Sequence, residues 1–398
     1  MTRRKTHRRT SLRKTTRTWL AVGCALLGGA GAATYAGASS PVQPERHART
    51  ASVHTVPLTD DGIGVDTYAY RGPQHFSAVM MTWEDPRAQM PGTPEIRTHS
   101  ARNGSWSPWT RLSAEPLAAD WAEGRHPGTR GGTASVWAGE SDGFDIRVVR
   151  GDGTITKDLP RGTAVRLLDP GDDPEPTAQL GTTFKAGKPP IIPQARWGAT
   201  ARHNGKPRYG STVKAVIIHH TGVNSDNKVS CARSRARMRT IQQEHLARGY
   251  YDVGYNFVVD RCGQIFEGRS GGSGRPVLGA HDVGFNTNTV GIAYLGNTMT
   301  ARPTRAALRA IARLVAWKLG RYGVGPVGRV RLVSGSGKGV DGNKVPQGKA
   351  VTLPRVFGHR HTNATDCPGR HLYRQLPALP RLAESLGRPH AARPSTTP

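Results

Sequence analysis

The stretch Val216-Ile217-Ile218-His219-His220-Thr221 decides the fold of the C-terminal half of the chain. It completes an apolar run that begins at Val213, and its β-branched residues are typical of a buried strand. Val253–Val259 and Thr289–Leu295 are predicted to be further strands. Helical patterns alternate with these strands, so this half is predicted to be an α/β domain with a mixed central sheet and flanking helices.

Two segments carry the helical patterns. Ser230–Arg248 suits a helix with one face directed to the core. The second segment spaces its apolar residues at three and four, which predicts an amphipathic helix that ends at Gly320. Gly323–Gly348 is rich in glycine and is expected to be an exposed loop. The apolar faces of the two helices are formed by Met238, Ile241 and His245, and by Leu308, Ile311, Ala312, Val315 and Leu319.

The half of the chain that precedes this domain has a different pattern. Short apolar runs such as Phe76–Trp83 and Phe144–Val149 are separated by Gly, Pro and Asp, and Asp152-Gly153 is typical of a hairpin turn. With 49 Gly and 29 Pro in 398 residues, turns and β structure are favoured over long helices. We therefore expect an all-β domain of sandwich, barrel or propeller type.

These patterns divide the chain into six segments. Trp106 and Trp109, in the β-rich segment, either stack on a ligand or pack in the core, and packing is the commoner use of such residues. The segments are a secretory signal peptide (1–38), a disordered segment (39–54), a β-rich domain of unknown role (55–168), a linker (169–193), the α/β domain (194–383) and a disordered tail (384–398).

The first 38 residues have the order of a secretory signal. Eight Lys and Arg residues and no acid lie in the first 18 positions, an apolar stretch follows from Trp19, and Ala36-Gly37-Ala38 fits a cleavage site. An uncleaved anchor is the main alternative. Arg8-Arg9 weakly resembles a twin-arginine signal, and Cys24 lies in a poor lipoprotein context. The protein is therefore expected to be secreted.

The chain is strongly basic, with 56 Lys and Arg against 28 Asp and Glu, and its formal net charge is +28. Cleavage of the signal removes eight basic residues and leaves the charge near +20. Such a charge favours anionic partners, and export favours anionic cell-wall polymers over nucleic acid. Simple solubility with an arginine-rich codon bias explains the charge equally well. Because no basic–aromatic surface motif is present, no specific nucleic acid is expected.

Cysteine arithmetic points to one disulfide and one distinct thiol. Once Cys24 has left with the signal, Cys231, Cys262 and Cys367 remain. An odd number of cysteines in an oxidising compartment suggests one pair and one cysteine with another use.

A metal site would account for that third cysteine. His359 precedes Cys367 by eight residues, and zinc readily binds His nitrogen and Cys sulfur. With one histidine of the His219-His220 pair they would supply three ligands, which leaves Cys231 to pair with Cys262. Taken alone, however, a histidine pair at a strand end is more often structural, and a lone cysteine is more often simply buried.

A series of ordered blocks from Val216 to Leu376 resembles the peptidoglycan recognition protein and type 2 N-acetylmuramoyl-L-alanine amidase family. The N-terminal half also looks like the region that precedes such domains in secreted actinobacterial members, which is a weaker likeness. The blocks are Ile217-Ile218-His219-His220-Thr221, Ile241-Gln242-Gln243-Glu244-His245, Asp252-Val253-Gly254-Tyr255-Asn256-Phe257, Glu267-Gly268-Arg269, Gly279-Ala280-His281, Gly284-Phe285-Asn286, Val290-Gly291-Ile292, Gly358-His359 and Thr365-Asp366-Cys367-Pro368-Gly369.

The resemblance implies a role for each of several residues. His361 departs from related secreted sequences, which often carry Asp there, and it would either compete as a ligand or change the surroundings of the site. Glu267-Gly268-Arg269 and His245 are expected to be structural. The implied roles are zinc ligation by His219, His359 and Cys367, catalysis by Tyr255 and Thr365, and substrate contact by His220, His281 and Asn286.

The activity implied by the resemblance is hydrolysis of the amide bond between N-acetylmuramic acid and L-alanine of the peptidoglycan stem peptide. The expected protein is a monomeric, secreted, cell-wall-associated enzyme that uses Zn²⁺. The alternative is a non-catalytic peptidoglycan-binding module. Members that only bind peptidoglycan usually lack the ligand cysteine, and this chain retains Cys367.

Overall fold

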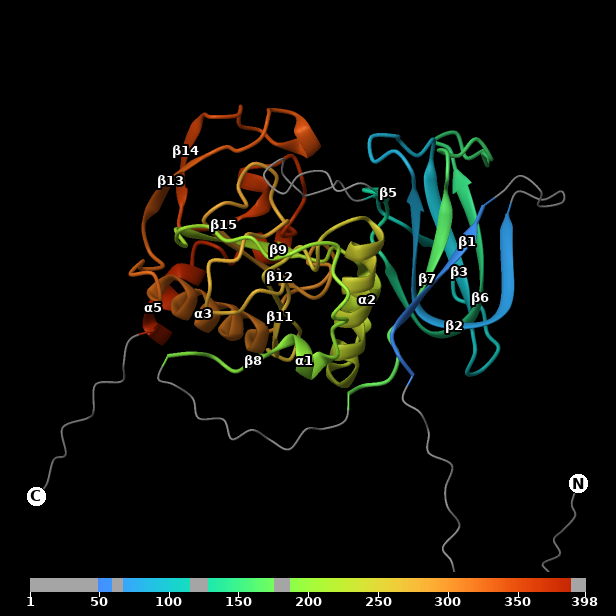
Figure 1. Cartoon of the computed structure of the whole chain (residues 1–398), viewed down its shortest axis with the longest axis horizontal. Coiled ribbons are helices and arrows are strands. Elements are labelled where there is room, and N and C mark those ends of the chain that lie inside the picture. The colour runs from blue at the N-terminus through green and yellow to red at the C-terminus, as the bar shows by residue number, and fades with distance from the viewer. Residues whose placement is uncertain (1–48, 59–66, 115–127, 175–186, 388–398) are drawn as a thin grey trace, which may run out of the picture. The chain divides into compact units, whose positions relative to one another are not determined.

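The computed structural model describes residues 49–58, 67–114, 128–174 and 187–387 (Figure 1). The signal peptide, Cys24 and most of the predicted disordered segments lie outside these residues. The described chain forms one large antiparallel sheet, followed by a mixed sheet with helices on its faces. The predicted fold class, an all-β domain before an α/β domain, is confirmed.

The N-terminal sheet has seven strands in the order β1-β7-β2-β6-β3-β4, with β5 paired to β2. β1 begins inside the segment predicted to be disordered, because its backbone pairs with β7 over its whole length. The strands are β1 Ser52–Pro57, β2 Tyr68–Trp83, β3 Thr93–Ser100, β4 Thr110–Arg111, β5 Gly131–Gly132, β6 Val136–Val149 and β7 Ala164–Asp169.

Strand β2 changes character along its length. Its first half is exposed or half-buried, whereas Phe76–Trp83 is buried on both faces. Val79 and Met81 lie in the main core of the sheet, and Ala78 and Met80 lie in a second cluster on the opposite face. The second face is buried because helix α2 (Ser234–Ala247) packs against β2 and β7.

The C-terminal sheet has six strands in the order β15-β9-β12-β10-β11-β8. All its pairs are parallel except β10 with β11, so the sheet is mixed as predicted. β9 and β12 are buried at every residue, as expected of parallel strands covered on both faces. The strands are β8 Ile191–Ile192, β9 Ala215–His220, β10 Phe257–Val259, β11 Ile265–Glu267, β12 Thr289–Tyr294 and β15 Val356–Gly358.

Helices cover both faces of this sheet (Figure 1). On one face α3 (Arg305–Gly320) and α5 (Leu379–Gly387) pack together over β9, β10 and β12. α3 is the amphipathic helix predicted from the apolar spacing, and its first turn is capped by the Thr304 hydroxyl, which accepts from Ala307 N at 3.1 Å. On the other face lie α1 (Gln194–Trp197) and α2. The short α4 spans Arg370–Tyr373.

Three further sequence predictions need correction. The expected strand Val253–Val259 is shorter than predicted, because only Phe257–Val259 pairs in the sheet. The glycine-rich stretch expected to be a loop contains β13 (Arg329–Val333), which pairs with β14 (Ala350–Pro354). Leu332 and Leu353 of this hairpin are buried in a shared apolar cluster, which offsets the unfavourable composition.

Helix α2 is the third correction, because it is buried beyond the single face predicted. Arg237 and Arg239 are only 1% and 3% exposed. Arg239 donates to Pro170 O and Trp197 O and pairs with Asp173, so it fixes the start of the predicted linker. The disulfide Cys231–Cys262 joins the turn before α2 to the turn after β10, as predicted.

Candidate metal and substrate site

Strand register brings the candidate ligands together. In the parallel pair β15–β9, Gly358 lies opposite Ile218. The next residues along the chain, His359 and His219, therefore lie side by side at the carboxyl ends of these two strands. Side chains alternate along a strand, which places His219 on the face of Ala215 and Ile217. The turn Asn363–Cys367 then brings the chain back to the carboxyl ends of these strands, where Arg360 N donates to Cys367 O at 3.0 Å.

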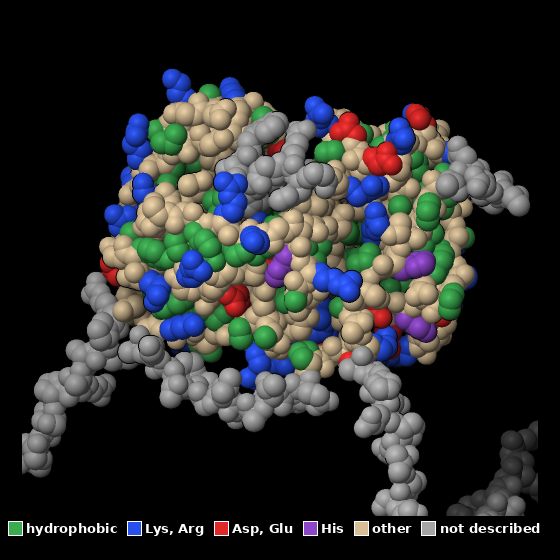
Figure 2. Space-filling model, in the orientation of Figure 1, with side chains coloured by type: hydrophobic (Ala, Val, Ile, Leu, Met, Phe, Trp, Pro, Cys, Tyr) green, Lys and Arg blue, Asp and Glu red, His purple; other side chains and the backbone are tan. Residues whose placement is uncertain are grey.

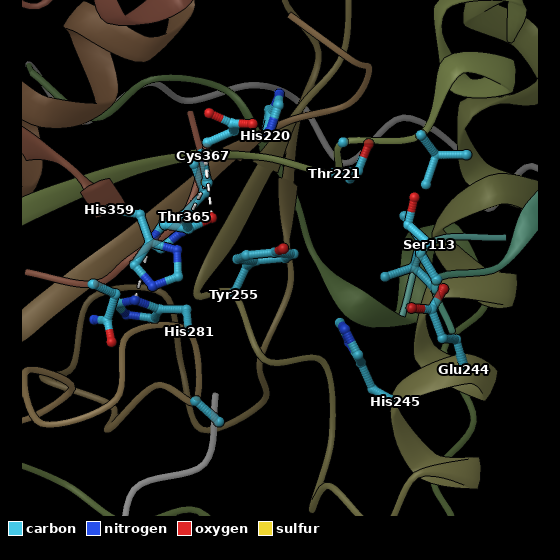
Figure 3. Close-up of a pocket in the computed structure, with 18 of the residues that line it drawn as sticks. Ser113, His220, Thr221, Glu244, His245, Tyr255, His281, His359, Thr365 and Cys367 are labelled. Carbon is cyan, nitrogen blue, oxygen red and sulfur yellow. Dashed lines mark hydrogen bonds between the residues drawn. The ribbon is translucent and has the colours of Figure 1, made fainter. Parts of the chain in front are cut away.

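His219, His359 and Cys367 form a compact cluster in which one ligand atom of each lies within 4.8 Å of the others. Cys367 Sγ lies 3.6 Å from His219 Nδ1, and the two imidazole rings have centroids 4.7 Å apart. Figure 3 shows His359 and Cys367 on one side of the pocket. Within the described ranges this is the one group of three such residues close enough to hold a metal ion.

Both imidazoles of the cluster are held neutral. Burial, followed by the nearby His359, lowers the pKa of His219 well below its ordinary value. Burial also lowers the pKa of His359 to about 3. A neutral imidazole has a lone pair to give to a metal, whereas a protonated one does not.

The donor set fits zinc. Two neutral imidazoles and one thiol, converging from three separate segments, are the soft and borderline ligands that zinc prefers. Three protein ligands leave a fourth position for water or substrate, as in catalytic rather than structural zinc sites.

His281 contacts the cluster through His219. Its Nδ1 lies 3.1 Å from His219 Nε2, so one neutral ring donates to the other. The ring fits because two glycines leave room for it: a Cβ on Gly279 or on Gly291 would come within 2.3 Å of the imidazole. This contact suits a residue that orients a metal ligand, and His281 also lines the pocket, so its predicted substrate contact stays a prediction.

Asn286 does not line the pocket. It is fully buried, and its Oδ1 accepts from His281 N at 2.8 Å and Asp282 N at 3.0 Å. The predicted substrate contact therefore has no support in the geometry. Asn286 instead holds the turn that carries His281.

His220 lines the pocket beside the cluster without belonging to it. Its Nδ1 accepts a hydrogen bond from Thr298 N at 3.1 Å, so the neutral ring carries its proton on Nε2. Burial, followed by the charge of Arg360, lowers the pKa of His220 to about 4. The side chain is therefore a neutral donor at the pocket wall, and its predicted substrate contact stays a prediction.

The two predicted catalytic residues reach the same pocket from different elements (Figure 3). Tyr255 is half-buried before β10, and its ring centroid lies 5.4 Å from that of His219. The Thr365 hydroxyl accepts from Cys367 N at 3.1 Å. A hydroxyl that accepts in this way keeps its proton to donate elsewhere.

His361 lies apart from the cluster. Its Nδ1 contacts both Gly358 N and Gly358 O, at 3.3 and 3.0 Å, and its ring packs beside Tyr373 at 5.4 Å between centroids. It therefore shapes the turn that presents His359. Competition for the metal, one of the two predicted roles, has no support in this geometry.

Glu267-Gly268-Arg269 is structural, as expected. The Arg269 guanidinium is 3% exposed and donates to Val253 O at 3.0 Å. His245, however, does more than fill the core. It lines the pocket, and its Nδ1 accepts from Gly254 N at 3.2 Å, so its proton lies on Nε2.

The pocket has a volume of about 440 Å³ and extends well beyond the three candidate metal ligands. Its far side is formed by Glu244 and His245 of α2 and by three residues of the N-terminal sheet domain, Ser113, Ala114 and Ala134. None of these five residues was predicted from the sequence to contact substrate. A family block does contain Glu244 and His245, but no local pattern marks the other three.

The C-terminal domain is similar to known proteins. Residues 209–370 match the family model described as N-acetylmuramoyl-L-alanine amidase. The chain is 31% identical over 202 residues to a peptidoglycan-recognition protein of Drosophila simulans, and this match covers 50% of the chain and 92% of the relative. The chain belongs to the peptidoglycan recognition protein and type 2 amidase family.

A longer relative matches over a smaller share of its length. Human N-acetylmuramoyl-L-alanine amidase is 32% identical over 209 residues, which are 52% of this chain and 31% of the human protein. Among solved structures, Drosophila PGRP-LB is similar at 26% identity, covering 47% of this chain and 91% of its own, with a TM-score of 0.35.

The N-terminal region has its own match. Residues 39–178 match the model described as Rv3811 N-terminal galactose-binding domain-like. The β structure of the described part of this region agrees with that description. None of the helices in the described ranges is long and apolar enough to cross a membrane.

Proposed function

We propose that the protein is a zinc-dependent hydrolase of peptidoglycan that cleaves the amide bond between N-acetylmuramic acid and L-alanine of the stem peptide. The observation that carries the proposal is the convergence of His219, His359 and Cys367 in a pocket that also holds Tyr255 and Thr365. Family membership alone does not decide between cleavage and binding. The intact three-ligand set favours cleavage.

When bound, zinc supplies a Lewis acid for the amide carbonyl and lowers the pKa of a water that it binds. His219, His359 and Cys367 would hold the ion. His281 keeps His219 in its orientation through the 3.1 Å contact between their ring nitrogens.

Two hydroxyl side chains of the pocket would stabilise charge that develops on the amide oxygen. The Thr365 hydroxyl accepts from Cys367 N and so has its proton free to donate toward the pocket. Tyr255, which lies just before β10, presents its phenol in the same pocket (Figure 3). Donors of this kind are commonly worth about 10² to 10³ in rate.

The remaining parts of the proposal concern where the protein works. The signal-like N-terminus supports secretion, and the excess of basic residues supports association with anionic cell-wall polymers. Figure 2 shows many Lys and Arg side chains and few Asp and Glu on the face displayed over the C-terminal sheet. Both proposed partners, peptidoglycan and the anionic polymers, are components of the cell wall, so the protein is proposed to act there.

The experiment uses the full mature chain and purified peptidoglycan. We expect new N-terminal L-alanine amines, no new sugar reducing ends, loss of the product with a zinc chelator and its return with added zinc. New reducing ends would assign a glycosidase instead. Binding to peptidoglycan with no product, in protein that carries its zinc, would overturn the proposal and establish a recognition module.

A further inference from the structure

The side of the pocket that faces the metal cluster is a wall contributed by the N-terminal sheet domain. Ser113, Ala114 and Ala134 line the same pocket as His359 and Cys367. Figure 3 shows Ser113 across the pocket from His359 and Cys367, with Tyr255 between them. Ser113 and Ala114 are exposed, so their side chains are available to a ligand in the pocket.

This wall is part of a hydrogen-bonded ladder rather than a free loop. Ala134 N donates to Ser113 O at 2.9 Å, and Ala114 pairs with Thr133 across an antiparallel bridge. Thr133 in turn is fixed to β2, because its amide donates to Met81 O at 3.0 Å and its hydroxyl accepts from Met81 N at 3.1 Å. The wall therefore has the rigidity of the sheet that carries it.

The wall is also locked to helix α2 by a buried charged network. Ser135, the residue after the wall, donates its amide to Glu244 Oε2 at 3.1 Å and its hydroxyl to the same oxygen. Arg237 donates to the Ser135 hydroxyl at 2.7 Å and pairs with Asp226 at 2.7 Å. All four groups are buried.

The same network continues to the metal end of the pocket. Asp226 accepts from the Thr221 hydroxyl at 2.7 Å, and Thr221 follows directly after His219-His220. Val223, two residues further, lies in the apolar core of the N-terminal sheet. The wall and the strand end that carries His219 are thus joined by a continuous series of contacts that are buried or half-buried.

From these contacts we infer that Ser113, Ala114 and Ala134 are part of the substrate site: a peptidoglycan fragment bound at the metal cluster packs against this wall. The inference rests on the proposed function for the identity of the ligand. It assigns to the N-terminal domain the far boundary of the pocket, so that this domain limits which muramyl peptides enter.

The chemistry at the wall suits a hydroxyl-rich or amide-rich ligand. The Ser113 hydroxyl and the Nε2–H of His245 are polar groups on that side, and Tyr250 adds an aromatic ring. The small side chains of Ala114 and Ala134 set the width. A cavity of about 440 Å³ is in the range of sites that enclose one small ligand, and a large side chain on the wall would fill a substantial part of it.

The test enlarges the wall without touching the ligands of the metal. Ser113→Trp and Ala114→Trp are compared with wild type in the zinc-loaded full chain, on a soluble disaccharide-tetrapeptide fragment of peptidoglycan. The matched control is Ser105→Trp, at an exposed serine of the same domain that does not line the pocket. Ala114→Leu is a milder second variant in case a tryptophan at this place prevents folding.

We expect kcat/KM of the wall variants to fall at least about tenfold, mainly through KM, with zinc content and Tm unchanged and with Ser105→Trp equal to wild type. If wild type does not cleave the fragment, the fragment stays intact and its Kd is measured by calorimetry, with the same tenfold expectation. Loss of the proposed catalytic function and loss of the proposed substrate contact at the wall can thereby be distinguished. Folded wall variants with wild-type KM or Kd would overturn the inference, and a wild type that neither cleaves nor binds would overturn it together with the proposed function.

Discussion

The two ends of the pocket are built in different ways. At the candidate metal end, His219 lies near the end of β9 and His359 directly follows β15, and the parallel register of these two strands brings them together. At the wall end, Ser113 and Ala134 lie between strands of the N-terminal domain, and the neighbouring Ser135 is held to α2 by hydrogen bonds with Glu244 and Arg237. The first end is set by backbone pairing within one domain, and the second depends on contacts between distant segments. The candidate metal ligands and the wall that bounds the substrate site are therefore positioned by different structural features.

The largest effect is expected at the metal end. Cys367→Ser replaces the thiol of the cluster by a poorer zinc ligand, so the variant should lose its bound zinc and its hydrolysis of peptidoglycan. Zinc content by mass spectrometry and release of L-alanine amines measure the two effects. His54→Asn is the control, because His54 is exposed on β1, does not line the pocket and should leave zinc content at the wild-type level.

The next largest effect is expected in the network behind the wall. Arg237→Met leaves Asp226 buried without its 2.7 Å partner and removes two contacts to Ser135. Breaking a buried pair in this way costs about 3 to 5 kcal/mol. Denaturant unfolding should show that loss of free energy of unfolding. Arg235→Met, on the same helix but half-buried, is the control and should change it by less than about 0.5 kcal/mol. Equal stability of the two variants would contradict the account.

Thr365→Ala separates the donor from the metal ligands. The variant should keep its zinc while kcat falls by about 10² to 10³, because one hydrogen-bond donor to the developing charge is lost. Thr365→Ser keeps the hydroxyl and should retain most of the rate. If Thr365→Ala has wild-type kcat, the assignment of Thr365 as a donor is wrong.

The smallest effect is expected in the pH dependence of stability, through His245 near the wall. Burial, followed by the charges of Arg248 and Arg269, lowers the pKa of His245 to about 3, against an ordinary value of 6.5. Between these values the unfolded chain binds the proton and the folded chain does not, so stability is full above pH 6.5 and falls as the pH falls toward 3.

His245→Asn removes this group but keeps an acceptor near Gly254 N. Its free energy of unfolding should fall less steeply than that of wild type between about pH 6 and pH 4, by at most about 1.4 kcal/mol per pH unit. Unfolding curves at several pH values measure the slope. His75→Asn, at an exposed histidine of β2, should keep the wild-type slope. An unchanged slope in His245→Asn would show that His245 is not buried as a neutral ring.

The contrast between the two ends also explains what the sequence could predict. The run Val216–Thr221 and the spacing of His359 and Cys367 are local signals, and they predicted the strand and a cluster with one histidine of the His219-His220 pair. The choice of His219 followed from the family resemblance. The partners of Arg237 could not be predicted in this way. Ser135 is 102 residues distant, and nothing near Arg237 in sequence indicates that it is buried. β13 was missed because its buried leucine lies in a glycine-rich stretch.

The proposed function requires that the cluster of His219, His359 and Cys367 is a catalytic zinc site. The most direct measurement adds zinc in steps to metal-free full-length protein and records bound zinc and the rate of L-alanine amine release on the same samples. We expect the rate to rise in proportion to bound zinc and to level off at one ion per chain, with no such rise in Cys367→Ser. Release at the full rate from zinc-free protein, or full zinc occupancy with no release, would contradict the claim.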